Sequence, residues 1–208
     1  MTDSFDRVQF VVRTITDTCI ANEKYFGDLD SVVGDGDFGY SLARGFERVA
    51  EGWDAFDRTD IGTFLSKVAV VITSRVGGTS GPIWGTAFLR AGSIAKGKVD
   101  LTGDDVVAML RAAIAGIMAR GGASLGEKTL LDALVPMTDT IEQCLADGQS
   151  TPEILDAAAA SARAAAEATK ELEAKRGRAS YTGERSIGSV DPGAIAVAVL
   201  MEKIDETW

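Results

Sequence analysis

Three aspartates lie close together in a short glycine-rich stretch near the N-terminus. Asp30, Asp35 and Asp37 occur within GDLDSVVGDGDFG, residues 27–39, and glycines stand at positions 34, 36 and 39. Like charges repel, so this crowding becomes favourable when a hard divalent cation binds between the carboxylates, because oxygen ligands suit Mg²⁺ or Ca²⁺. The stretch predicts a metal site, and a solvated acidic turn with helix-capping aspartates is the alternative.

The spacing does not match the calcium-binding loop of a helical hairpin. Counting from Asp35, Gly39 stands at the fifth position and Phe46 at the twelfth, where a bidentate Glu belongs. Three carboxylates do not make a full cage for either ion. A Mg²⁺ ion that keeps several waters and needs substrate phosphates to complete its octahedron fits better.

Two further loops carry residues that could contact phosphates. GGTSG, residues 77–81, opens a helix, so its backbone N–H groups and the hydroxyls of Thr79 and Ser80 form a plausible phosphate cradle. The alternative is a glycine C-cap followed by a serine N-cap. The basic stretch KRGRAS, residues 175–180, is a solvated loop in the ordinary interpretation, but Arg178 could hold a phosphate if the loop folds over a nucleotide.

GGASLGEKT resembles a P-loop at first sight. Glu127 separates Gly126 from Lys128, however, and no strand precedes the stretch. We reject the P-loop interpretation.

The composition excludes several classes of chemistry and partner. The chain has no histidine, which excludes histidine triads, histidine metal ligands and a phosphohistidine. The net charge of −10 makes nucleic acid an improbable partner, because such binding depends on clustered lysine and arginine. The two cysteines, Cys19 and Cys144, are expected to be buried reduced thiols. No long apolar span and no leader are evident, so we expect a cytoplasmic protein that does not bind a membrane.

The elements that must position these residues are helices. Apolar residues recur every three or four positions from Phe5 to about Phe26, and cap or proline signals begin further helices at Asp60, Thr102, Thr151 and Asp191. Two apolar runs, residues 68–72 and 194–201, could pass for strands, but their flanks favour helix. The expected helices cover residues 5–26, 41–52, 61–76, 82–95, 103–120, 128–147, 151–175 and 192 onward.

We therefore predict an all-α bundle of about eight helices in a single domain over residues 1–208, with no strand. Pro136 should kink or divide the sixth helix. The glycine-rich loops, at residues 34–39, 77–81, 121–126 and 177–193, fall at the turns of the bundle, where alternate loops of antiparallel helices share an end.

Several of these motifs, in this order, resemble the L subunit of dihydroxyacetone kinase, the nucleotide-binding module of that family. The motifs are LDSVVGDGDFG, RVGGTSGPIWGTAF, GGASLGEKTLLDAL and RGRASYTGERSIGSVDPGA, and the likeness extends over nearly the whole chain. The resemblance implies an all-α fold of eight helices in an antiparallel barrel, with the nucleotide in loops at one end. An apolar ligand in the centre of the barrel is left open.

The resemblance also assigns site residues. It implies that Asp30, Asp35 and Asp37 hold two Mg²⁺ ions that bridge the phosphates of ADP or ATP, with no catalytic residue beyond the metal and phosphate ligands. The implied nucleotide contacts are Phe38, Gly39, Tyr40, Ser41, Thr79, Ser80, Gly121, Leu130, Arg178, Asp191, Pro192 and Gly193. One departure is plain, because the family usually has histidine where this chain has Phe38.

The implied reaction is phosphoryl transfer, which depends chiefly on positioning and charge neutralisation and requires no histidine on this chain. In the resembling system a separate K subunit binds dihydroxyacetone. Where the donor is the phosphotransferase system, a multi-phosphoryl protein recharges an ADP that stays bound. A kinase component for another hydroxy-ketone or an acyl substrate, and a non-catalytic helical regulator, are the alternatives. The oligomeric state is left open, with a homodimer as one option.

Overall fold

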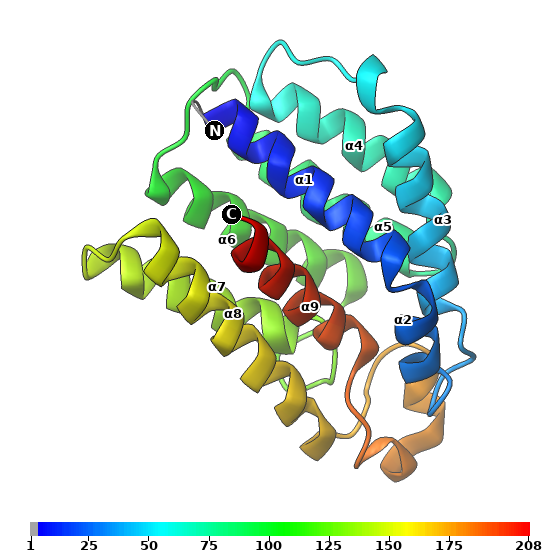
Figure 1. Cartoon of the computed structure of the whole chain (residues 1–208). Coiled ribbons are helices and arrows are strands. Elements are labelled where there is room, and N and C mark those ends of the chain that lie inside the picture. Colours follow the sequence, from blue (N-terminus) through cyan, green and yellow to red (C-terminus); the bar gives the residue numbers. More distant parts are fainter. Residues whose placement is uncertain (1–3) are drawn as a thin grey trace. The chain divides into compact units, whose positions relative to one another are not determined.

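The only regular secondary structure in the part of the chain that the structure describes is helical. The structure, a computed structural model, describes residues 4–208, which contain nine α-helices, three short 3-10 helices and no strand (Figure 1). The first two α-helices, α1 (Ser4–Ala21) and α2 (Glu23–Asp30), are separated only at Asn22. Counted as one, they give the eight helices expected, and the all-α prediction is confirmed.

By its internal contacts the chain divides into two compact units. Unit 1 comprises the described residues through Ala21 together with Ser41–Gly121, and unit 2 comprises Asn22–Tyr40 and Gly122–Trp208. The prediction of a single domain stays a prediction. No helix in residues 4–208 combines the length and the apolar character needed to cross a lipid bilayer.

Unit 1 is built around packed helices whose starts follow the sequence signals. Its helices besides α1 are most of α3 (Phe38–Glu51), α4 (Ile61–Arg75), α5 (Ser80–Ile94) and α6 (Gly103–Gly121), with a 3-10 turn, η1, at Trp53–Ala55. Helix α4 packs on α5, and α5 packs on α6. The Asp60 carboxylate accepts a hydrogen bond of 2.8 Å from the Thr63 N–H, which confirms the predicted cap of α4.

Aromatic rings fill one part of the core of unit 1. The fully buried Phe64 of α4 has three ring neighbours, Phe5, Trp53 and Phe56, with centroids 5.6–6.0 Å away in edge-to-face arrangements. Such pairs stabilise a core beyond the area they bury. The residues 68–72 that could pass for a strand lie within α4, so the helical interpretation is confirmed.

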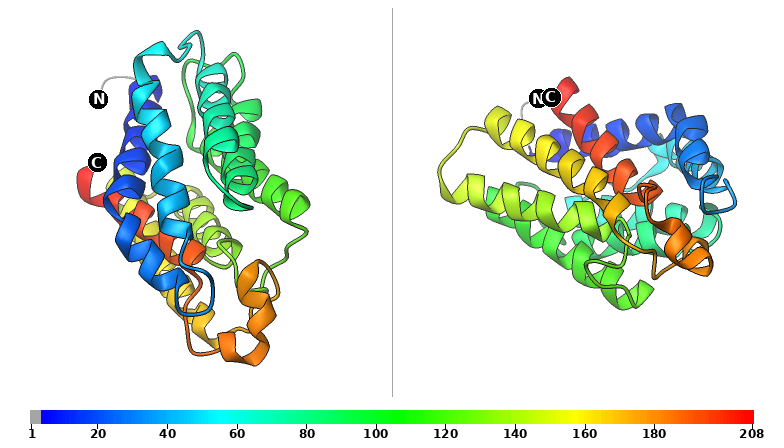
Figure 2. Two further views of the ribbon diagram at one scale, coloured as in Figure 1. Left: turned by 90° about the vertical axis from the view of Figure 1, so that its right-hand side faces the viewer. Right: turned by 90° about the horizontal axis from the view of Figure 1, so that it is seen from below.

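Unit 2 contains α2 and three long helices. These are α7 (Leu131–Ala146), α8 (Thr151–Ala168) and α9 (Pro192–Thr207), which lie side by side with α8 packed on both α7 and α9 (Figure 1 and Figure 2). Three alanines spaced four residues apart on α8, Ala158, Ala162 and Ala166, are fully buried. The apolar run 194–201 lies within α9, so it is helix, as predicted.

Some predicted boundaries in unit 2 were wrong. Helix α8 ends at Ala168 rather than near residue 175, and a 3-10 turn, η2 (Thr169–Glu171), follows it. Ser150 rather than Thr151 caps α8, because the Glu153 carboxylate accepts from both its N–H and its hydroxyl, at 2.8 and 2.6 Å. Pro136 lies inside α7 and does not divide it, and the alternative of a kink stays a prediction. Much of the expected polar loop 177–190 is the 3-10 segment η3 (Arg178–Ser186), with a kink at Gly183.

Both cysteines are buried and free, as predicted. Burial from solvent raises the pKa of the Cys19 thiol far above its usual range. The Cys19 thiol is therefore not suited to nucleophilic chemistry.

The start of α9 carries a carboxyl group with a perturbed pKa. Asp191 accepts a 2.7 Å hydrogen bond from the Ala194 N–H, which confirms the predicted cap. Burial raises the pKa of Asp191 to about 7, an effect that the negative charge of Asp132 increases and the charge of Lys128 opposes. The folded chain therefore binds a proton at Asp191 between about pH 4 and pH 7 that the unfolded chain does not bind.

Replacing Asp191 by asparagine should flatten the pH dependence of stability. The contribution of the protonated carboxyl is full below pH 4 and is lost as pH rises through 7. Asparagine still caps a helix but does not titrate. The wild-type free energy of unfolding in urea should fall between pH 5 and pH 8 by on the order of 1–3 kcal/mol more than that of the Asp191→Asn variant.

Asp60→Asn is the matched control, because hydrogen bonds from Thr63 lower the pKa of this cap, so its titration lies below the tested window. Equal pH dependence in the wild type and in Asp191→Asn would contradict the raised pKa of this carboxyl.

Candidate metal centre and phosphate-binding loops

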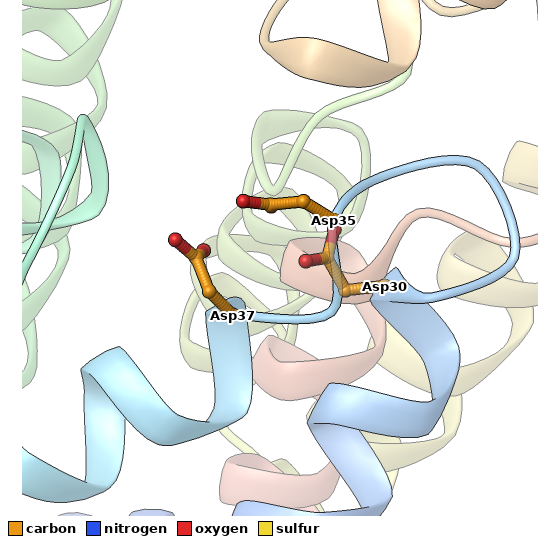
Figure 3. Close-up of side chains that lie close together, drawn as sticks. All are labelled: Asp30, Asp35 and Asp37. Atoms are coloured by element: carbon orange, nitrogen blue, oxygen red, sulfur yellow. The ribbon is translucent and has the colours of Figure 1, made fainter.

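The three aspartates converge in unit 2, in the turn between α2 and α3. Asp30 is the last residue of α2, and Asp35 and Asp37 precede the first residue of α3. One carboxylate oxygen from each lies within 4.8 Å of the others, and the three side chains point into the same space (Figure 3). The predicted convergence is therefore observed. The donor set consists only of carboxylate oxygens, which is the chemistry that Mg²⁺ prefers.

Two glycines allow the turn to fold this tightly. A Cβ placed on Gly34 would overlap the carboxylate of Asp30, so only glycine leaves that side chain in its place. Gly36 adopts a φ of +76°, in the left-handed region that favours glycine. The backbone therefore brings Asp35 and Asp37 back toward the end of α2.

Phe38 supports the turn from the side of α3. Its N–H donates to the Asp30 carboxylate at 3.3 Å, and its half-buried ring lies 6.1 Å from the ring of the fully buried Phe26. The contact to Asp30 comes from the backbone and does not depend on the side chain. The aromatic side chain thus packs the turn against α2, a role that histidine would fill less well.

A basic side chain lies against the acidic cluster. The guanidinium of Arg178, at the start of η3, forms an ion pair with the Asp35 carboxylate and lies 3.6 Å from a carboxylate oxygen of Asp37. All of these side chains are more than a third exposed, so the pairing is screened by water and contributes little to stability. It does place a guanidinium beside the acidic cluster.

A second pair of predicted contacts meets at the start of α9. A Cβ placed on Gly193 would lie 3.3 Å from the Cβ of Leu130, which is the N-cap residue of α7. Pro192 is the first residue of α9. The structure therefore brings together Leu130 and the Asp191–Gly193 stretch, which lie about sixty residues apart in sequence.

The loop GGTSG, residues 77–81, with the hydroxyls of Thr79 and Ser80, belongs to unit 1. Thr79 is the N-cap residue of α5 and Ser80 is its first residue, so the predicted start at Pro82 was two residues late. A Cβ placed on Gly77 would lie 3.0 Å from the hydroxyl oxygen of Ser41, so Ser41 lies beside this loop. Free N–H groups in the first turn of a fifteen-residue helix suit an anion.

The remaining predicted contacts stand at element boundaries. Gly39 and Tyr40 are in the first turn of α3, where Gly39 is buried and Tyr40 is 58% exposed, and Gly121 is the last residue of α6. Thr79, Ser80, Ser41 and Gly121 fall in unit 1, and the other predicted site residues fall in unit 2. Their shared role in binding stays a prediction.

Unit 2 contains one buried charged residue, Lys128, that the sequence did not predict. Lys128, only 3% exposed, donates from its Nζ to the carbonyl oxygen of Leu172 at 3.0 Å and to that of Ser186. Its backbone φ is +61°, a conformation that no sequence signal at this position predicts. The resemblance of GGASLGEKT to a P-loop gives no reason to expect that the ammonium group of Lys128 is buried.

Comparison with known proteins gives the family. The DAK2 domain model matches residues 32–206. The PEP-dependent dihydroxyacetone kinase ADP-binding subunit DhaL of Escherichia coli is 37% identical over 203 residues, which cover 97% of this chain and 97% of that protein. The PTS-dependent dihydroxyacetone kinase ADP-binding subunit DhaL of Lactococcus lactis is 34% identical, covering 89% of this chain and 88% of that protein.

Larger proteins contain a similar region. The L-erythrulose 1-kinase of Mycolicibacterium smegmatis is 40% identical over 94% of this chain, which spans 34% of that protein. The crystal structure of the dihydroxyacetone kinase of C. freundii in complex with AMP-PNP and Mg²⁺ matches 98% of this chain and 34% of that one, with a TM-score of 0.78 and 27% identity. The match of the family model over most of the sequence, together with these relatives, shows that the chain belongs to the DAK2-domain family.

Proposed function

We propose that this chain is the ADP- or ATP-binding, magnesium-dependent subunit of a dihydroxyacetone kinase, a phosphotransferase. In this proposal it transfers a phosphoryl group to dihydroxyacetone held on a separate K subunit, and its bound ADP is recharged by a donor of the phosphotransferase system. The observation that carries the proposal is the convergence of three carboxylates within 4.8 Å beside a guanidinium, in a chain that matches a DhaL subunit over 97% of both sequences.

The acidic cluster has the donors for the metal. Asp30, Asp35 and Asp37 would hold Mg²⁺, and two ions are proposed because the family resemblance implies two. When bound, the metal neutralises phosphate charge during transfer. The tight glycine turn and the Phe38 N–H hold the Asp30 carboxylate close to those of Asp35 and Asp37.

Other residues of this chain would bind and orient the nucleotide. Arg178 has a planar fork of donors that matches phosphate oxygens, and exchanging a screened carboxylate pair for a phosphate costs little. The N–H groups and hydroxyls of Thr79 and Ser80 would bind phosphate at the start of α5. The contact between Leu130 and Gly193 offers an apolar surface on which a flat base can pack.

A kinase subunit for another small ketose is the second candidate. The similarity to the erythrulose kinase of Mycolicibacterium smegmatis favours it, and the nucleotide chemistry would be the same. Activity assays with purified K-type partners and with dihydroxyacetone or erythrulose as acceptor distinguish the two. A non-catalytic helical regulator would instead have a thermal stability that does not respond to nucleotide.

Neutralising two of the aspartates should abolish magnesium-dependent ADP binding. Calorimetry with ADP and Mg²⁺ should give binding to the wild type, with a loss of at least about a hundredfold in Asp35→Asn plus Asp37→Asn, because two charged ligands are removed. Chelation of Mg²⁺ should weaken wild-type binding to a similar extent.

Asp28→Asn is the matched control, because Asp28 lies on the same helix as Asp30 but pairs with Lys24 at 2.6 Å. Unchanged affinity in the double variant would overturn the metal assignment.

Adding one methyl group at Gly34 should disturb the same site. The new Cβ overlaps the Asp30 carboxylate and must displace it, so Gly34→Ala should weaken Mg·ADP binding by roughly tenfold or more. Val32→Ala, at an exposed position of the same turn, should bind like the wild type. Phe38→His keeps the backbone N–H to Asp30 and should stay within about threefold of wild-type affinity. Wild-type binding by Gly34→Ala would show that the position of Asp30 is not critical.

A further inference from the structure

The segment that carries Arg178 leaves the body of unit 2 and returns to it at a narrow neck. The two sides of the neck are joined by hydrogen bonds, from the Gly188 N–H to the Lys170 carbonyl and from the Ala174 N–H to the Ser186 hydroxyl, both 2.8 Å long. We term residues 173–185, which lie between Leu172 and Ser186 in the sequence, the arginine segment. Its far part includes Tyr181, which is 89% exposed.

Lys128 bridges this neck from a third part of the chain. Its ammonium donates to Leu172 on the incoming side and to Ser186 on the outgoing side, the two residues that flank the arginine segment. Carbonyl oxygens joined through a buried ammonium are held more firmly than carbonyls exposed to water, because charge-assisted hydrogen bonds strengthen when water is excluded. A single side chain thus closes the base of the segment.

The turn that carries Lys128 is itself held rigidly. The Asp132 carboxylate accepts from the N–H groups of Gly126 and Thr129, at 2.6 and 2.8 Å, and the Glu127 carboxylate accepts from the Ser124 N–H at 2.8 Å. The φ of +61° at Lys128 is one that L side chains rarely adopt. Such a conformation persists where the surrounding contacts require it. Here those contacts include the hydrogen bonds of the Lys128 side chain at the neck.

Hydrogen bonds of Glu127 also join the turn that carries Lys128 to the arginine segment. The Glu127 carboxylate forms a bidentate pair with Arg176, at 2.7 and 3.0 Å, and the Glu127 carbonyl accepts from the Lys175 N–H at 3.0 Å. Arg178, two residues further on, reaches Asp35 and Asp37. The contacts therefore run from the buried lysine, through the arginine segment, to the acidic cluster.

We propose that Lys128 is a positioning residue for nucleotide binding: its buried ammonium closes the base of the arginine segment and so holds Arg178 where it meets the phosphates. The part concerning nucleotide rests on the proposed function, whereas the closure of the segment does not. Lys128 acts through Arg178 and does not itself contact the ligand.

Limited proteolysis tests the closure without any ligand. Trypsin should cut within the arginine segment, at Lys175, Arg176, Arg178 or Arg185, at least about fivefold faster in Lys128→Met than in the wild type, because local opening exposes these bonds. Lys203→Met removes an exposed lysine of α9 that pairs with Glu206 and should be cut like the wild type. Lys128→Gly removes the amine while suiting the positive φ, and it replaces Lys128→Met if that variant does not fold. Cleavage of the segment at the wild-type rate would overturn the proposal.

A double-mutant cycle tests the route through Arg178. Lys128→Met should weaken Mg·ADP binding about tenfold in the wild-type background and by less than about twofold in an Arg178→Gln background, because the residue through which it acts is then absent. A lysine that only stabilised the fold would give equal losses in both backgrounds, and that result would overturn the positioning role. If the wild type itself binds no ADP, the proposed function fails, and the proteolysis rates still decide whether Lys128 closes the segment.

Discussion

The structure around the candidate site depends on holding like charges close together. Three carboxylates within 4.8 Å repel one another. Their separation is fixed by a tight turn in which positions 34 and 36 accommodate only glycine. The chain offsets this repulsion with the Arg178 guanidinium, whose pairing in water is weak. A cluster that is neutralised only weakly by its own protein is suited to a cation and to the phosphates that accompany it.

Unit 2 also contains a buried charged residue. Lys128 is enclosed among carbonyl oxygens, and its pKa is lowered by burial while the nearby charge of Asp191 raises it. Asp191 in turn caps α9 and lies next to the contact between Gly193 and Leu130. Lys128 joins the loop that follows α6 to residues on both sides of the arginine segment, and Asp191 caps the start of α9.

The parts that the sequence predicted well are those set by local chemistry. The caps at Asp60 and Asp191, the buried cysteines and the helical nature of both apolar runs follow from nearest neighbours along the chain. The convergence of Asp30, Asp35 and Asp37 was predictable because their spacing is short. The end of α8 and the 3-10 segment at Arg178 were not, since alanine-rich and polar stretches propagate or end a helix according to tertiary contacts. Lys128 escaped prediction because its partners, Leu172 and Ser186, lie more than forty residues away.

In the proposed function, the acidic turn binds a divalent cation together with a nucleoside diphosphate. The most direct test is anomalous diffraction from crystals grown with ADP and Mn²⁺, a substitute for Mg²⁺ that prefers the same ligands. We predict manganese peaks bonded to oxygens of Asp30, Asp35 and Asp37, with Arg178 moved from the carboxylates onto a phosphate. Crystals with ordered ADP, no manganese at the turn and Arg178 still paired with Asp35 would contradict the account.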